Sequence, residues 1–160
     1  MQETLVGMAD LKTAKAPAVL TTIGLGSCVG IALYDTVNKV AGLAHAMLPD
    51  STKISNNANV AKFVDTGTAV LLEMMLKLGA KKGLIKAKLA GGAQMFDIDA
   101  KNELMRIGDR NVEAAKKILQ FMNIPIIAAQ TGENFGRTIK LDAQSGALTI
   151  KTVGRGVFTI

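Results

Sequence analysis

The residues of this 160-residue chain that could do covalent chemistry are its single cysteine, Cys28, and its single histidine, His45. Cys28 directly follows the turn "GLGS" (24–27), and His45 lies seventeen residues further on, in "AGLAHAMLP". At neutral pH only a small part of a free thiol is ionised, so a nucleophilic cysteine needs a neighbouring base, usually a histidine. The pair therefore fits nucleophilic thiol catalysis.

The turn before the cysteine and the strand that leads into it contain the other groups that such a reaction needs. The glycines of the turn would let the backbone N–H groups of Ser27 and Cys28 face a developing oxyanion. The base needs a hydrogen-bond partner on its second ring nitrogen, and Thr21 and Thr22 lie on the incoming strand. Because side chains alternate along a strand, only one threonine can point at the site. The alternation does not say which one.

The same residues also have a purely structural interpretation. A lone cysteine among apolar residues is most often a small buried hydrophobe. His45 lies between two alanines, which suits a partly buried histidine whose hydrogen bonds are satisfied. The spacing alone leaves both interpretations open.

Cofactors and metals are not expected. One cysteine and one histidine cannot supply a structural zinc site. Gly24 and Gly26 begin like a dinucleotide fingerprint, but its third glycine would fall at Val29, and no Gly-Lys-Thr/Ser phosphate loop is present.

The composition indicates a single cytoplasmic domain over residues 1–160. The net charge is +6, but aromatic residues make up only 4% and tryptophan is absent, so base stacking and nucleic-acid binding are not expected. The lysine-rich stretch at 77–88 fits a solvated surface, with attraction to an acidic protein as the alternative. No apolar run approaches the ~20 residues that cross a bilayer, and the first residues do not resemble a signal peptide.

The hydrophobic pattern predicts an α+β fold. Apolar and β-branched runs predict strands at about 18–24, 28–34, 40–48, 84–90, 125–130, 137–142 and 147–153. Turn residues in "LDAQSGALTI" predict a hairpin between the last two. Helical periodicity appears within 59–80 and 109–123. We expect a layered sandwich of mixed β-sheet flanked by two main helices.

Five stretches together resemble one protein family over roughly residues 3–155. They are "TTIGLGSCVGIALYD", "AGLAHAMLP", "AKLAGGAQMF", "IGDRN" and "GRTIKL". In this order they are similar to CheD, the family of chemoreceptor glutamine deamidases of bacterial chemotaxis. The chain departs from the family pattern at 131–137, "TGENFGR", where the family often has Gly-Gly before the late Gly-Arg.

The resemblance implies a mechanism and chooses between the two threonines. It implies that Cys28 is the nucleophile, that His45 is the general base and acid, and that Thr22 orients the histidine. The substrates would be specific glutamines of methyl-accepting chemoreceptors, which become glutamates. The resemblance also implies that the protein binds CheC, a phosphatase of the response regulator CheY. Two alternatives remain: a protein that mainly regulates CheC by binding, and a generic thiol amidase.

Overall fold

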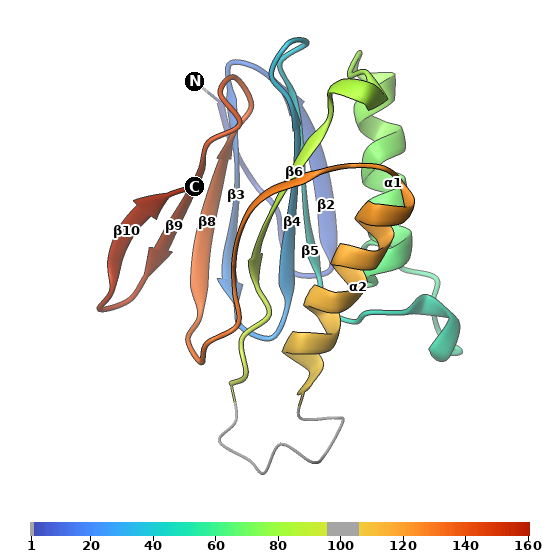
Figure 1. The fold of residues 1–160 in the computed structure, drawn as a ribbon, viewed down its shortest axis with the longest axis vertical. Helices are drawn as coiled ribbons and strands as arrows, with labels where there is room; N and C mark the ends of the chain where they lie inside the picture. Colours follow the sequence, from blue (N-terminus) through green and yellow to red (C-terminus); the bar gives the residue numbers. More distant parts are fainter. Residues whose placement is uncertain (1, 96–105) are drawn as a thin grey trace.

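The computed structural model describes residues 2–95 and 106–160, which form two β-sheets packed face to face with helices against one of them (Figure 1). The first sheet has the strand order β1-β3-β8-β9-β10, and the second has the order β2-β5-β4-β6-β7. Both helices lie on the outer side of the second sheet, so the layers are sheet, sheet and helix.

The strands of the first sheet are β1 (Gln2–Leu5), β3 (Ala18–Leu25), β8 (Arg137–Asp142), β9 (Leu148–Thr152) and β10 (Gly156–Thr159). Those of the second sheet are β2 (Asp10–Lys15), β4 (Val29–Asp35), β5 (Val40–Ala46), β6 (Lys86–Gly91) and β7 (Ile126–Thr131). Most pairs are antiparallel, whereas β1–β3 and β6–β7 are parallel. Both sheets are therefore mixed.

The helices are α1 (Val64–Lys77) and α2 (Ile107–Phe121), and short 3₁₀ turns are η1 (Ser51–Lys53), η2 (Val60–Lys62) and η3 (Lys82–Leu84). The buried side of α1 includes Leu71 and Met75, and that of α2 includes Ala115 and Leu119. A spacing of four residues places both members of each pair on one helix face. None of the helices in the described residues is long and apolar enough to cross a membrane.

Strands β4 and β5 are buried along their whole length, because they have neighbours on both faces. Their side chains alternate between two cores. Ile31 and Ala44 pack with the helices, whereas Ala32 and Leu43 lie between the two sheets. We call the buried residues between the two sheets, which include Ala32 and Leu43, the inter-sheet core.

The predicted fold class is confirmed: the protein is an α+β sandwich of mixed sheets with two main helices. All seven predicted strands and both helical segments are present, and β8 and β9 form the predicted hairpin. Three further strands, β1, β2 and β10, were not predicted. The hairpin therefore joins β8 to β9, but β9 is not the last strand.

Candidate functional site

Cys28 and His45 lie on the same face of the second sheet. Cys28 is in the loop between β3 and β4, and Gly30 pairs directly with His45 in the β4–β5 ladder. Because Cys28 precedes Gly30 by two residues, its side chain points to the same face and lies diagonally across from His45. Cys28 belongs to the inter-sheet core and is 8% exposed, while His45 is completely buried.

Thr22 reaches His45 from the opposite sheet. The Thr22 Oγ1 lies 2.7 Å from His45 Nδ1, and the same hydroxyl donates to the carbonyl of Val6, also at 2.7 Å. Thr21, on the other face of β3, donates instead to the carboxylate of Glu3 at 2.8 Å. The structure therefore brings His45 together with Thr22 and not with Thr21.

These two hydrogen bonds determine the tautomer of the imidazole. A hydroxyl has one hydrogen, and a carbonyl can only accept, so the Thr22 hydrogen points at Val6. The Thr22 oxygen must then accept from His45, which places the imidazole hydrogen on Nδ1 and a lone pair on Nε2. The buried Nε2 has no hydrogen-bond partner among the residues that the structure describes. A basic nitrogen is thus left free inside the inter-sheet core.

Burial keeps both reactive groups neutral. It lowers the pKa of His45, because the imidazolium form would be poorly solvated. Burial also raises the pKa of the Cys28 thiol, and the backbone N–H of Cys28 offsets this in part. The resting site therefore holds a thiol and a neutral imidazole, which suits proton transfer during the attack rather than a preformed ion pair.

Three successive carbonyls of the cysteine loop accept hydrogen bonds from other parts of the chain. The carbonyl of Gly26 accepts from Ala93 N at 2.9 Å, and that of Cys28 accepts from Gly92 N at 2.8 Å. The carbonyl of Ser27 accepts from a side chain of α2. Within residues 2–95 and 106–160, the N–H groups of Ser27 and Cys28 donate to no backbone carbonyl. They are the groups expected to hold an oxyanion.

Gly91 allows β6 to approach this loop closely. Its φ is +102°, and a Cβ at this position would lie 2.4 Å from the carbonyl oxygen of Cys28. No other residue type fits such a contact without moving the backbone. Residues 90–93 thus support the cysteine loop from behind.

The late loop that departs from the family pattern is held against the same glycine. Arg137 is almost fully buried, and its guanidinium donates to the carbonyls of Gly91 at 3.4 Å and Gly132 at 3.0 Å. It also donates to the side-chain oxygen of Gln130. This loop therefore braces the back of the cysteine loop.

Two residues that contact the site were not recognised as site residues in the sequence. The Val6 carbonyl contributes through its backbone, which leaves no signal in residue type. Asn111 is fully buried in α2. It belongs to the "IGDRN" stretch that contributes to the family resemblance, but the sequence predicted no function for it. In the sequence, Asn111 is a polar residue directly before the apolar Val112, within the predicted helix at 109–123.

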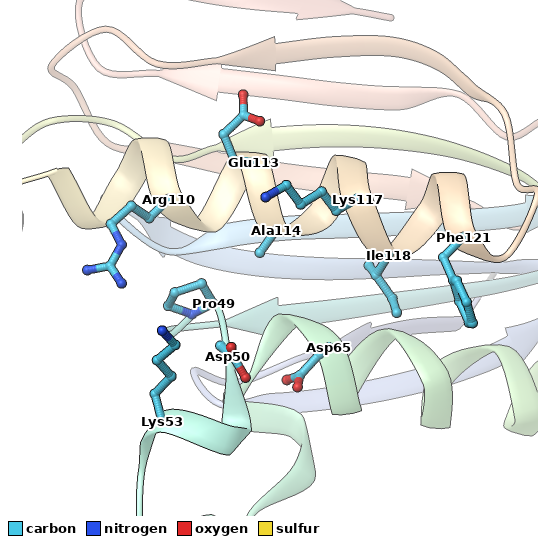
Figure 2. Close-up of a pocket in the computed structure, with 10 residues that line it drawn as sticks. All are labelled: Pro49, Asp50, Lys53, Asp65, Arg110, Glu113, Ala114, Lys117, Ile118 and Phe121. Carbon is cyan, nitrogen blue, oxygen red and sulfur yellow. The ribbon is translucent and has the colours of Figure 1, made fainter.

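A separate pocket of about 450 Å³ lies between α2 and the chain that follows β5. Figure 2 shows Arg110 of α2 near Pro49 and Lys53, whereas Phe121 lies at the other end of the same helix. Neither Cys28 nor His45 lines this pocket. Among the described residues, no cluster of three or more metal-ligating side chains occurs.

The fold is similar to those of two solved structures. The chain is similar to the Bacillus licheniformis protein YfiH, with a TM-score of 0.50, 17% identity, and coverage of 78% of this chain and 51% of the other. It is also similar to the Neisseria meningitidis protein NMB0706, of family DUF152, with a TM-score of 0.51, 10% identity, and coverage of 83% and 64%. At these identities the likeness concerns the fold alone.

Sequence comparison gives the family. The model "CheD chemotactic sensory transduction" matches residues 47–152. A protein of Caldanaerobacter subterraneus named "Probable chemoreceptor glutamine deamidase CheD" is 57% identical, covering 95% of this chain and 94% of the relative. The Bacillus licheniformis "Chemoreceptor glutamine deamidase CheD" is 51% identical, covering 97% and 93%. The chain belongs to the CheD family.

Proposed function

We propose that this protein is a chemoreceptor glutamine deamidase in which Cys28 is the nucleophile, His45 the general base and acid, and Thr22 the residue that orients the base. One observation carries the mechanism: Thr22 donates to Val6 and accepts from His45, so the free Nε2 is a base. Family membership and the names of the relatives support the substrate class. The reaction converts receptor glutamines to glutamates.

The first half of the reaction forms a thioester. His45 Nε2 takes the proton of the Cys28 thiol as the sulfur attacks the side-chain amide carbon of glutamine. The N–H groups of Ser27 and Cys28 stabilise the negative oxygen of the tetrahedral intermediate. His45 then gives its proton to the amide nitrogen, the C–N bond breaks, and ammonia leaves.

The second half hydrolyses the thioester. Water loses a proton to His45 Nε2 and its oxygen attacks the thioester carbon. The C–S bond breaks, the proton returns to the Cys28 sulfur, and a glutamate side chain is released. The thiol and the neutral imidazole of the resting state are thereby restored.

Two parts of the proposal rest on the sequence alone: the cytoplasmic location, which follows from the composition, and binding of the CheC phosphatase, which follows from the family resemblance. Binding would be tested by titrating CheC with wild-type protein and with Cys28→Ala. If the catalytic and the regulatory roles are separate, the variant binds CheC and alters its phosphatase activity as wild type does. Loss of CheC binding in a folded Cys28→Ala protein would contradict this separation.

The deciding experiment measures ammonia release from the cytoplasmic fragment of a chemoreceptor. Wild type should release ammonia and convert discrete glutamines to glutamates, as seen by peptide mass spectrometry. Cys28→Ala should do neither. Absence of release by wild type, or release by the variant, would overturn the proposal. Equal release from unrelated proteins would indicate a generic thiol amidase.

A further inference from the structure

The side chain of Asn111 joins the two halves of the site. Asn111 lies in the second turn of α2 and is completely buried. Its Nδ2 donates to the carbonyl of Ser27 at 2.9 Å and to the carbonyl of Met47 at 2.9 Å. Ser27 directly precedes Cys28, and Met47 follows His45 by two residues. One amide group therefore ties the loop of the nucleophile to the end of the strand that carries the base.

The contact with Ser27 also sets the direction of a backbone N–H. The carbonyl of Ser27 and the N–H of Cys28 belong to the same peptide unit, which is planar and trans, so they point in opposite directions. When Asn111 fixes the carbonyl, it fixes the N–H as well. That N–H is one of the two groups expected to hold the oxyanion.

The backbone N–H of Ala93 sets the other donor in the same way. Ala93 N fixes the carbonyl of Gly26, which shares its peptide unit with the N–H of Ser27. The two expected oxyanion donors thus each have their orientation fixed by a hydrogen bond on the opposite side of the peptide.

Gly108 explains how α2 comes close enough for Asn111 to reach both carbonyls. A Cβ on Gly108 would lie 2.4 Å from the carbonyl oxygen of Ala93 and 2.6 Å from that of Gly92. The first turn of α2 therefore packs directly on the backbone that holds the cysteine loop. Asn111 follows by three residues, which places it on the same helix face as Gly108.

The Oδ1 atom of Asn111 shows which half of the carboxamide is used. It is buried and accepts no hydrogen bond in the part of the chain that the structure covers. An apolar residue of similar size would remove this unpartnered acceptor but would leave the carbonyls of Ser27 and Met47 without their donor. What Asn111 provides is therefore its two N–H donors.

We propose that Asn111 is a positioning residue of the thiol site, whose carboxamide fixes the Cys28 N–H for oxyanion binding and holds the Cys28 loop in place against the His45 strand. The inference rests on the proposed deamidase function for its kinetic effect. It also makes a structural claim that can be measured without any substrate. Asn111 itself touches no reacting atom.

The kinetic test compares Asn111→Leu and Asn111→Ala with wild type on a receptor fragment. The leucine variant keeps most of the buried volume but loses both donors. We expect kcat to fall about 10- to 100-fold in both variants while KM stays within about twofold, because the donors act on the transition state. Ala115→Gly, one turn further along α2, is the matched control for general weakening of the helix. It should keep kcat within about twofold below its unfolding temperature.

The second readout is the backbone amide signal of Cys28 in ¹H–¹⁵N spectra. In Asn111→Leu this signal should shift and its hydrogen exchange should accelerate by about tenfold or more, whereas Ala115→Gly should leave both unchanged. An unchanged Cys28 signal in Asn111→Leu would overturn the proposal, as would an equal loss of kcat in Ala115→Gly. If wild type releases no ammonia, the proposed function fails, and the amide signal still decides whether Asn111 fixes this peptide.

Discussion

The hydroxyl of Thr22 and the imidazole of His45 join the two sheets of the sandwich through a buried contact of 2.7 Å. Because the hydroxyl also donates to Val6, this contact leaves the lone pair of His45 on Nε2. The basicity of one nitrogen thus depends on a threonine from another sheet and on a carbonyl beyond β1. Each feature of this arrangement can be tested separately.

Replacement of Thr22 should impair the base without unfolding the protein. Thr22→Val keeps the shape but removes the acceptor for His45 Nδ1, so both the tautomer and the ring orientation are released. We expect kcat to fall about 10- to 100-fold, less than the loss of about a thousandfold in His45→Ala. The matched control is Thr21→Val, whose hydroxyl bonds Glu3 on the opposite face of β3. If Thr21→Val were the more damaging variant, Thr22 could not be the residue that orients the base.

Removal of the proposed nucleophile should abolish activity at little cost to the fold. Cys28→Ala deletes one small buried group, and we expect kcat to fall by about a thousandfold or more with a folded circular-dichroism spectrum. Cys28→Ser should be nearly as inactive, because a hydroxyl is far less acidic than a thiol. Both are measured by ammonia release from a receptor fragment. Wild-type turnover by either variant would exclude the thiol as nucleophile.

The lowered pKa of His45 should appear in the dependence of stability on pH. Below about pH 6.5 the histidine of the unfolded chain binds a proton, while the buried imidazole stays neutral until a lower pH. The unfolded state then binds more protons, so the free energy of unfolding falls as the pH falls, by at most about 1.4 kcal/mol per pH unit.

Urea unfolding of wild type and His45→Gln from pH 7 to pH 5 measures this effect. The carboxylates contribute equally to both proteins, so the difference between the two curves isolates the histidine. Wild type should lose more stability over this range than the variant. Parallel curves would mean that the pKa of His45 is not lowered by folding.

The close approach of β6 to the cysteine loop predicts unequal effects of two glycine substitutions. Gly91→Ala places a Cβ 2.4 Å from the Cys28 carbonyl in a left-handed conformation, and we expect a loss of about 3 kcal/mol in stability together with a large loss of kcat. Gly154→Ala is also left-handed, but open space surrounds it, so strain alone should cost about 1 kcal/mol. Equal effects on stability and full activity in Gly91→Ala would show that the loop can move aside.

The sequence predicted the elements whose side chains are buried in a regular pattern. Strands β3 to β9 and both helices have such patterns, and the resemblance selected Thr22 over Thr21. Strand β2, "DLKTAK", has no apolar alternation and is a strand because it pairs with β5 at the sheet edge. All residues of strand β10 are exposed to solvent, and it likewise exists through pairing with β9.

The residues around the thiol could also be predicted only in part from the sequence. Asn111 and Cys28 are far apart in the chain, and their proximity depends on how α2 packs against the cysteine loop. No spacing rule links them, because the contact runs through a side-chain amide and a backbone carbonyl. The "IGDRN" stretch was visible in the sequence, but its role followed only from the packing of Gly108 and Asn111.

Substrate choice should depend on a folded receptor surface rather than on the glutamine alone. Cys28 is only 8% exposed, so the glutamine side chain must reach down to the thiol while its backbone stays outside. The protein carries a net charge of +6. Helical receptor segments rich in glutamate and glutamine would be attracted to a protein of this charge.

Kinetics on three substrates tests this expectation: an intact receptor fragment, a short peptide around the same glutamine, and free glutamine. We expect the fragment to be the best substrate by about a hundredfold or more in kcat/KM, because only a folded surface supplies remote binding energy. Its kcat/KM should also fall as the salt concentration rises, since screening weakens electrostatic attraction. Arg110 directly precedes Asn111 in α2, so Arg110→Gln should lower kcat/KM for the fragment, whereas Lys86→Gln, at the opposite end of β6 from Gly91, should not. Comparable rates on free glutamine, without any effect of salt, would indicate a general amidase and would remove the receptor from the proposed function.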